Sequence, residues 1–380
     1  MNFTLSEEQE MLQASVRNFA AKCLAPVADT LDQSQEFAID NFKAMAKIGL
    51  TGIGIPQQYG GNDGDYVSLV VALEEVARAC ASTCDILDAH LTLCTEPIYL
   101  YGNEQQRKKY VMPLVRGDKI GSFAITESEA GSDISAIRTT AILKGDHYIL
   151  NGSKIFITNG DVCDIAVVFA NIPSLGKRGM TAFIVENGMA GFSKGKKYNK
   201  LGMRAATNAD LVFDDSRVPV ENRLGKEGQG MQICLGTLDR GRIGIAAQAI
   251  GITQAVLDRS KDYSKQRIQF GTPLANHQAI SWILADMATQ LEAARLLVYK
   301  AALLVDQGKP FASFAAMAKL FASELCMEAS TKGIQIFGGY GYMMESPMQR
   351  YFRDSKLTTI YEGTSEIQRM VISRSILSDK

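Results

Sequence analysis

The chain has 380 residues, of which 46% are hydrophobic and 21% are charged, which is ordinary for a globular protein with room for two or three packed layers or domains. Forty basic and 41 acidic side chains leave a net charge of −1, so nothing in the charge favours binding to nucleic acid or to an anionic membrane surface. No apolar run approaches membrane-spanning length, and Met1 leads straight into a polar helix start. The composition therefore predicts a cytoplasmic protein that needs neither nucleic acid nor membrane.

Cysteine and histidine usage argues against disulfides and metals. The seven cysteines are odd in number and scattered, and only Cys80 and Cys84 lie close together. This pattern predicts reduced core thiols in a reducing compartment. His90, His147 and His277 are far apart and show no metal-ligand spacing, so we expect no metal site.

The first third of the chain has helical patterns. Ser6, followed by acidic residues, is a predicted N-cap, and apolar residues recur at helical spacing over 42–50 and 69–81. The glycine-rich stretch 60–64 is a predicted loop.

From about residue 119 the pattern is typical of strands. Residues 148–160 are predicted as two short strands around an Asn151-Gly152 turn, and β-rich runs follow at 165–170, 181–186 and 209–214.

The helical period returns after Gly225, with long helices predicted over 243–266, 279–307 and 312–338. The fold class is therefore α+β and mostly α. Its domains are an N-terminal helical domain (1–120), a middle β-domain (121–226) and a C-terminal helical bundle (227–380). Since no low-complexity linker separates them, we expect the three to pack as one unit.

The segment 359–369 places an acid, Glu362, beside Gly363 and just ahead of a helix. Ser365 and Gln368 form a predicted capping box, which puts Glu362 in the loop that leads into the helix. Burial in such a loop raises the pKa of a carboxyl and makes it a usable general base near neutral pH. The alternative is an acid that only complements the helix dipole. This segment alone leaves both interpretations open.

Four other segments could bind a ligand or be purely structural. The small and hydroxyl residues of 123–133 suit either a flat ring or phosphate, or a polar surface turn, and 155–158 suit a ring wall or a plain strand. Residues 267–271 suit a diphosphate beside an adenine, or a simple helix end. The glycines of 337–342 suit a phosphate cradle or a tight turn. Their spacing does not fit a Rossmann dinucleotide fold.

Taken together and in order, these segments resemble the acyl-CoA dehydrogenase family, particularly its short-chain and butyryl-CoA branch, from about Phe3 to Ile376. The matching motifs are Thr126-Glu127 with Gly131-Ser132-Asp133, Asn151-Gly152-Ser153-Lys154, Leu238-Asp239-Arg240-Gly241-Arg242, 267–271 and Tyr361-Glu362-Gly363-Thr364. Each motif alone is weak, but the ordered set is highly specific.

The resemblance implies an FAD flavoenzyme with an N-terminal helical domain, a middle β-domain and a C-terminal four-helix bundle. It implies that Glu362 removes the pro-R α-proton of an acyl-CoA while a β-hydride passes to flavin N5. The backbone N–H of Glu362 and a flavin ribityl hydroxyl would bind the thioester oxygen, which stabilises the enolate as it forms. It further implies a dimer-of-dimers homotetramer and an electron-transferring flavoprotein as partner.

The residues implied at the cofactor fall into three sets. Around the flavin ring these are Phe123, Ile125, Thr126, Phe156 and Thr158, with Ser132 beside them and Thr364 and Glu366 on the C-terminal side. Arg267, Phe270 and Gln278 would hold the diphosphate and adenine, and Gln335, Gly338 and Gly339 would reach the cofactor from a neighbouring subunit. The acyl-CoA path would be lined by Ser132, Asp239, Arg242 and Gly363. The family often has tryptophan where this chain has Phe156.

The segment 81–92 is unusual because it carries Asp85 and Asp88, three apart on the helix that would wall the acyl pocket. One interpretation is that at least one of them caps the helix or faces water. The other is a polar or alicyclic acyl group, with a carboxylate or His90 near it. The leading prediction is 2,3-dehydrogenation of a short, branched or cyclic acyl-CoA. An alicyclic (cyclohexanecarboxyl-type) dehydrogenase, an acyl-CoA oxidase, an enoyl-CoA reductase and a non-catalytic scaffold are the alternatives.

Overall fold

The first helix starts where the sequence predicts. In the computed structural model, which describes residues 4–378, the Gln9 backbone N–H donates to Ser6 Oγ (3.2 Å) and the Ser6 N–H donates to Gln9 Oε1 (3.0 Å). These bonds form a capping box. The N-terminal helices are α1 (Glu7–Phe19), α2 (Ala28–Ser34), α3 (Ile39–Lys47), α4 (Tyr66–Ala79), α5 (Ala81–His90), α6 (Glu96–Tyr101), α7 (Glu104–Gln106) and α8 (Met112–Val115).

The middle part is an eight-stranded sheet with the order β6-β7-β3-β2-β4-β5-β8, in which β1 pairs with β4. The strands are β1 (Gly121–Ala124), β2 (Thr140–Lys144), β3 (His147–Thr158), β4 (Ile165–Asn171), β5 (Met180–Glu186), β6 (Phe192–Lys197), β7 (Asn208–Pro219) and β8 (Arg223–Leu224). Alternate residues of β4 enter different cores: Val167 packs with the helices and Val168 with the far side of the sheet. Both faces of β4 are therefore covered.

The predicted pair of strands around Asn151-Gly152 is wrong. Residues 147–158 form one strand, β3, and its register against β7 shifts between Leu150 and Gly152, which marks a bulge. Gly152 has φ 143°, and a Cβ there would lie 2.6 Å from Thr139 Oγ1. The glycine therefore serves close packing within the sheet and does not turn the chain.

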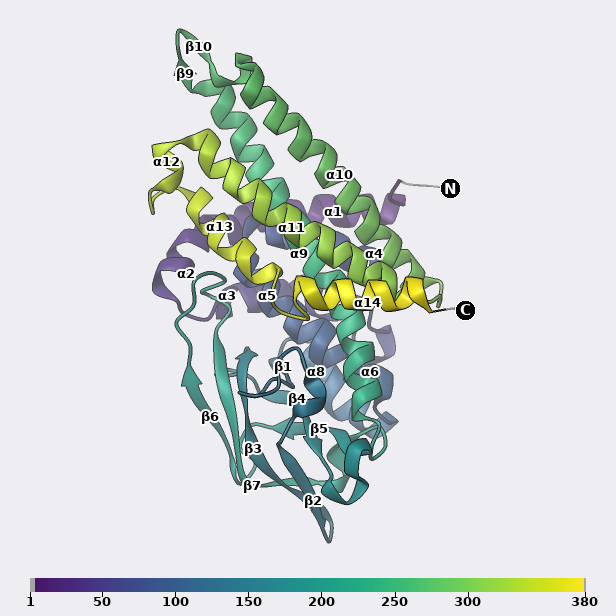
Figure 1. Cartoon of the computed structure of the whole chain (residues 1–380). Helices are drawn as coiled ribbons and strands as arrows, with labels where there is room; N and C mark the ends of the chain where they lie inside the picture. The colour runs from purple at the N-terminus through teal and green to yellow at the C-terminus, as the bar shows by residue number, and fades with distance from the viewer. Residues whose placement is uncertain (1–3, 379–380) are drawn as a thin grey trace.

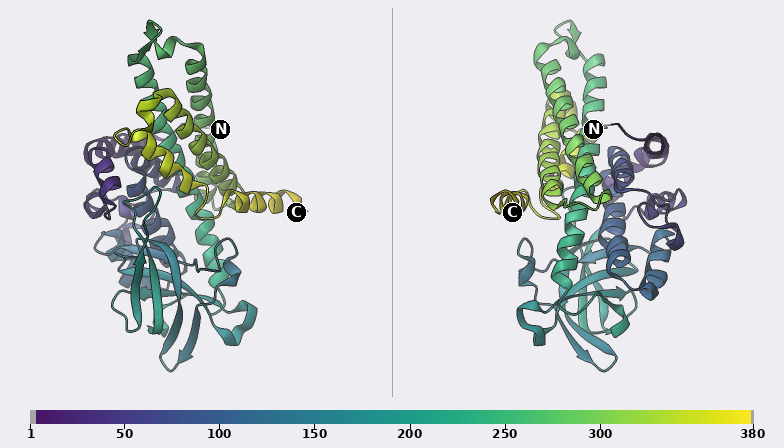
Figure 2. Two further views of the ribbon diagram at one scale, coloured as in Figure 1. Left: turned by 60° about the vertical axis from the view of Figure 1, so that its left-hand side comes forward. Right: turned by 90° about the vertical axis from the view of Figure 1, so that its right-hand side faces the viewer.

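Long helices form the C-terminal part (Figure 1). α9 (Gly230–Gln266) starts well before the predicted residue 243, while α10 (Gln278–Asp306) and α11 (Ala312–Phe337) agree closely with prediction. The short hairpin of β9 (Ile268–Gln269) and β10 (Thr272–Pro273) connects α9 to α10. The remaining helices are α12 (Gly339–Tyr342), α13 (Pro347–Thr358) and α14 (Ser365–Leu377). α14 projects sideways from the body in both views of Figure 2.

The three parts share one hydrophobic core, as expected from the absence of a linker. The Tyr66 backbone N–H of α4 donates to Asp306 Oδ1 of α10 (2.7 Å), and Arg295 of α10 pairs with the buried Glu74 of α4 (2.8 Å). The predicted three-domain fold class is confirmed by the structure and by the solved structures compared below. The domain boundaries themselves stay predictions.

All seven cysteines are free, and six are buried as predicted. The prediction of a core thiol is wrong for Cys23, which is exposed. Within residues 4–378, none of the helices combines the length and apolar character that crossing a membrane requires.

Candidate active site

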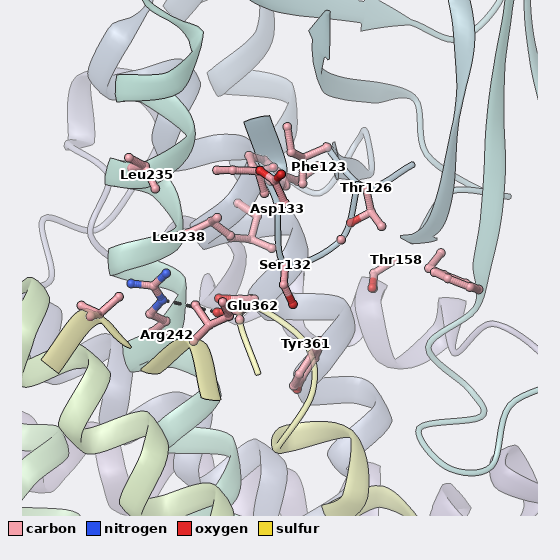
Figure 3. Close-up of a pocket in the computed structure, with 18 of the residues that line it drawn as sticks. Phe123, Thr126, Ser132, Asp133, Thr158, Leu235, Leu238, Arg242, Tyr361 and Glu362 are labelled. Carbon is pink, nitrogen blue, oxygen red and sulfur yellow. Dashed lines mark hydrogen bonds between the residues drawn. The ribbon is translucent and has the colours of Figure 1, made fainter. Parts of the chain in front are cut away.

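A cavity of about 620 Å³ lies where the sheet meets the helices (Figure 3). Its wall combines α5, β1 with the loop after it, the end of β3, the first turns of α9, and the loop before α14. The predicted site residues that line it are Asp85, Phe123, Ile125, Thr126, Ser132, Phe156, Thr158, Arg242, Glu362 and Gly363. Residues from every part of the chain therefore meet at one place.

Glu362 sits in the loop between α13 and α14, as predicted, and its backbone has φ 52°. The predicted cap is off by one residue: Thr364 is the N-cap, and its Oγ1 accepts from the Ile367 N–H (3.3 Å). Threonine and serine cap equally through a hydroxyl, so the sequence did not distinguish them. Gln368 instead donates to the carbonyl oxygens of Gly363 (2.8 Å) and Glu362 (3.3 Å), which ties the loop to α14.

Two buried cations hold the same loop from the other side. Arg242 of α9 donates from Nε to the Glu362 carbonyl oxygen (3.3 Å), and Lys319 of α11 donates from Nζ to the Gly363 carbonyl oxygen (2.8 Å). Figure 3 shows the bond from Arg242 beside the cavity. These contacts fix the backbone that directly follows the Glu362 side chain.

The Glu362 carboxyl is set up to hold a proton. Burial raises its pKa well above the usual range, Asp88 raises it further, and Lys319 and Arg242 act in the opposite direction. Its Oε2 receives no hydrogen bond from any group in residues 4–378. Burial also lowers the pKa of Lys319 to about 7, although the nearby Glu362 opposes that shift. A carboxyl with a raised pKa can serve as a general base near neutral pH.

Asp85 and Asp88 are both buried, with 3% and 1% of their surface exposed. Neither caps the helix, because the N-cap of α5 is Cys80 and makes no side-chain cap bond, so the interpretation as cap or solvent-facing residues is wrong. Burial raises the pKa of Asp85 to about 6 and that of Asp88 to about 8. Asp85 lines the cavity, whereas Asp88 does not.

His90 has a structural role, so the suggestion that it meets the substrate is wrong. Its Nδ1 accepts from the Gly121 N–H (3.0 Å), and its Nε2 lies 3.1 Å from the Leu114 carbonyl oxygen. Burial lowers its pKa to about 4, so the ring is neutral and connects α5 to β1 and α8.

The residues predicted for the diphosphate and adenine lie elsewhere. Arg267, Gly338 and Gly339 line a hollow of about 510 Å³ at the tip of the bundle, next to the β9–β10 hairpin and far from the sheet (Figure 1). The Arg267 guanidinium stacks over the Tyr340 ring at 5.7 Å, and Phe270 is 97% exposed. Gln278 starts α10 at the same end, and Gln335 lies in the last turns of α11. The structure thus places all of these residues at one tip of the bundle, and which subunit's cofactor each set contacts stays a prediction.

Three other predicted residues lie just outside the main cavity. Thr364 and Glu366 line a separate hollow of about 420 Å³ between α11, α13 and α14. Asp239 is not part of the cavity wall; it pairs with Arg242 Nη1 at 2.5 Å and so holds that arginine in place.

Sequence reasoning missed several residues at the site. Lys319 could have been noticed as the single charged residue in the apolar run 312–322, which predicts a buried partner. Gly241 and Gly244 lie three apart on α9, and no local signal showed what they face. Ala89 and Leu93 complete the apolar wall beyond Asp85. Among residues 4–378, no three His, Cys, Asp or Glu side chains are arranged to hold a metal ion.

Comparison with known proteins identifies the architecture. Family models described as the N-terminal, middle and C-terminal domains of acyl-CoA dehydrogenase match residues 6–118, 122–216 and 228–377. A short-chain specific acyl-CoA dehydrogenase of Clostridium acetobutylicum is 48% identical, over 99% of this chain and 100% of its own length. An acryloyl-CoA reductase (NADH) of Anaerotignum propionicum is also 48% identical, over 99% of this chain and 96% of its own length.

Two solved structures share the fold over the full length of both chains. Butyryl-CoA dehydrogenase from Megasphaera elsdenii superposes with a TM-score of 0.97 at 46% identity. A chain of the structure described as the electron transferring flavoprotein of Acidaminococcus fermentans superposes with a TM-score of 0.98 at 48% identity.

Proposed function

This chain belongs to the acyl-CoA dehydrogenase family and is an FAD-dependent oxidoreductase, and we propose that Glu362 is the base that removes the α-proton of an acyl-CoA. The reaction is 2,3-dehydrogenation of a short acyl thioester to the enoyl thioester. The observation that carries the assignment is the position of Glu362: it lines the cavity, its pKa is raised, and its backbone is fixed by Arg242 and Lys319.

The chemistry needs a base held still beside a carbon acid. An α-proton next to a thioester is weakly acidic, so Glu362 must approach it in a fixed geometry, and hydrogen bonds to the thioester oxygen must stabilise the developing enolate. The backbone N–H of Glu362, on a loop held from both sides, is the donor we assign to that oxygen. When bound, FAD supplies a two-electron acceptor for the β-hydride.

The ring side of the cavity fits FAD. Phe156 lines the cavity and is 56% exposed, so its ring is open to contact with a bound ligand. Hydroxyls of Thr126, Ser132 and Thr158 stand in the same wall and can bond the polar edge of a flat ring. Thr158 is itself held by a hydrogen bond from Asn208 Nδ2 (3.0 Å). These residues would hold the flavin ring.

We expect the purified protein to be yellow and to release one FAD per chain on acid denaturation, since the ring wall contains neither histidine nor cysteine for covalent attachment. The spectrum and mass of the released cofactor check this. Release of FMN, or a colourless preparation after gentle purification, would contradict the assignment and would favour a scaffold role.

The arrangement at the tip supports an oligomer. Arg267, Phe270 and Gly338 lie at the opposite end of the bundle from the ring wall. These residues can therefore contact an FAD bound at a ring wall only if that wall belongs to a second copy of the chain. We propose the dimer-of-dimers homotetramer on this ground. We also propose an electron-transferring flavoprotein as electron acceptor, supported by the chain at 48% identity in a structure described by that name.

The acyl end of the cavity favours a compact group. Ala89 and Leu93 give it apolar walls, but the buried Asp85 adds a carboxylate whose Oδ2 has no hydrogen-bond partner within residues 4–378. Burying an unpaired carboxylate against a long apolar tail is costly. We propose a short, branched or cyclic acyl group, with preference for one that carries a polar substituent near Asp85.

Asp85→Ala is expected to change kcat/KM for straight-chain and for cyclic acyl thioesters in opposite directions. It should raise kcat/KM for hexanoyl-CoA about 10-fold, because the carboxylate no longer meets apolar carbons, and it should lower kcat/KM for a cyclohexanecarboxyl thioester, because the enlarged pocket holds the ring loosely. Asp286→Ala, an exposed change on α10, is the control. Equal effects on all thioesters would return Asp85 to a structural role.

The function is tested with a panel of butyryl-, isobutyryl-, glutaryl- and cyclohexanecarboxyl-CoA, each followed by loss of flavin absorbance. Because a relative of equal identity is an acryloyl-CoA reductase, the panel should include reoxidation of the reduced enzyme by acryloyl-CoA. Dye reduction without peroxide supports a dehydrogenase, whereas peroxide formation would indicate an oxidase.

A further inference from the structure

Two carboxyl groups from distant parts of the chain meet against one face of α9. A Cβ added at Gly241 would lie 2.3 Å from Glu362 Oε2, and a Cβ added at Gly244 would lie 2.0 Å from Asp88 Oδ1. Residues three apart on a helix share a face, so both carboxyls occupy adjacent spaces that only glycine leaves open. Asp88 therefore lies beside the base, and unlike Glu362 it does not line the cavity.

Each of the two carboxyls lacks a hydrogen bond that the other can supply. Among residues 4–378, Asp88 Oδ2 and Glu362 Oε2 have no partner from any other group, although Thr92 Oγ1 lies 3.0 Å from Asp88 Oδ1. Two ionised carboxylates cannot hydrogen-bond to each other, and neighbouring like charges in a buried site repel strongly. One proton placed between them removes the repulsion and gives both oxygens a partner.

We propose that Asp88 is a positioning residue that shares one proton with Glu362 in the resting enzyme, so that the two carboxyls act as a single acid pair with one negative charge. This inference rests on the proposed function of Glu362. In turnover the substrate Cα–H bond breaks, and its proton forms an O–H bond on Glu362. The electron pair left on Cα forms the C2=C3 double bond as the β-hydride leaves to FAD. The pair then holds two protons, and one returns to water after the enoyl product leaves the cavity.

Charged and titratable groups surround the pair on every side. Lys319 of α11 and Arg242 of α9 favour negative charge at Glu362, while Asp85 of α5 opposes it. The other groups that act on the pair or border it are Tyr66 of α4, Cys84 of α5, Glu96 of α6 with its partner Arg240, and Tyr361 beside Gln248. Asp88 is the largest like-charge influence on Glu362 among them.

The decisive comparison is the pH profile of flavin reduction in the FAD-loaded enzyme, measured with butyryl-CoA for wild type, Asp88→Asn, Asp88→Leu and Asp85→Asn. In the resting pair the shared proton lets Asp88 donate to the ionised Glu362, which lowers the pH at which the base becomes active. Asparagine can donate its amide N–H in the same way, so the Asp88→Asn profile should stay close to that of wild type. Leucine has nearly the same shape but cannot donate, so the apparent pKa of the base should rise by at least about one unit in Asp88→Leu. One unit below the wild-type pKa, the Asp88→Leu rate relative to its own plateau should therefore be several-fold lower than that of wild type. Asp85→Asn should shift the profile less than Asp88→Leu. Superimposable profiles for wild type and Asp88→Leu would overturn the proposal.

A second measurement needs no turnover. Because the folded pKa of Asp88 is raised from 3.8 to about 8, the folded protein binds more protons than the unfolded chain between those values, so stability falls as pH rises through that window. The free energy of unfolding in urea should therefore fall more steeply between pH 5 and pH 8 for wild type than for Asp88→Asn. Equal slopes would also overturn the proposal. An inactive wild type with unequal slopes would instead refute the proposed function and leave the pair intact.

Discussion

Glu362→Gln is expected to keep FAD and acyl-CoA binding and to lower the rate of flavin reduction about 10²–10⁴-fold or more. Glutamine has nearly the shape of glutamate but cannot accept the α-proton, and the loop stays in place because Arg242 and Lys319 bind backbone carbonyls rather than the side chain. Stopped-flow measurement of flavin absorbance, together with the dissociation constant for the thioester, separates chemistry from binding.

The matched control for this variant is Glu345→Gln, because Glu345 is an exposed acid in the turn before α13. The control should show flavin reduction at the wild-type rate. If Glu362→Gln reduced FAD at a near-normal rate, the base would have to be sought elsewhere. Asp85 would be examined first because it is the other carboxyl in the cavity wall.

Glu127→Ala should destabilise the protein by about 3–5 kcal/mol and release FAD. Glu127 accepts hydrogen bonds from Lys154 Nζ (2.6 Å), the Arg138 N–H (2.6 Å), and the Thr139 N–H (3.0 Å) and hydroxyl (2.6 Å). Lys154 is fully buried, so removal of the carboxylate leaves a buried ammonium whose one remaining hydrogen-bond partner among residues 4–378 is the Ile125 carbonyl oxygen (3.1 Å). The loop that starts here carries Thr126 and Ser132 into the cavity, which links stability to cofactor binding.

Urea unfolding and the FAD content after gel filtration measure both effects. Glu129→Ala is the control from the same loop, because its ion pair with Arg138 at 2.5 Å is largely exposed and contributes about 0–1 kcal/mol. Equal stability losses in the two variants would show that the buried pair has no special role.

The position of Glu362 was predictable because its signal lies within a few consecutive residues: an acid beside a glycine, just ahead of a capped helix. The structure places Glu362 in the expected loop, and its pKa is shifted in the expected direction. The errors in local structure have equally local reasons. Thr364 and Ser365 are both good caps, and Asn151-Gly152 supports a turn or a bulge, so only the packing of Gly152 against Thr139 decides.

The arrangement in space was harder to predict than the residues themselves. The resemblance implied that Arg267 and Gly338 contact the cofactor, which stays a prediction, but only the long α9 and α11 show that both lie at the far tip of the bundle. The sequence contains no signal that places Asp88 beside Glu362. That contact depends on how α5 and the loop before α14 meet α9 at Gly241 and Gly244, where the two carboxyls fill the space that glycine leaves.

One anaerobic single-turnover experiment tests whether the enzyme catalyses 2,3-dehydrogenation of a short acyl-CoA. The FAD-loaded enzyme is mixed with butyryl-CoA, and flavin absorbance and product mass are followed together. We predict loss of the oxidised-flavin absorbance with formation of one enoyl thioester, lighter than the substrate by two hydrogens, for each FAD reduced. An unchanged flavin spectrum with butyryl-, isobutyryl- and cyclohexanecarboxyl-CoA alike, or bleaching without loss of two hydrogens from the thioester, would contradict it.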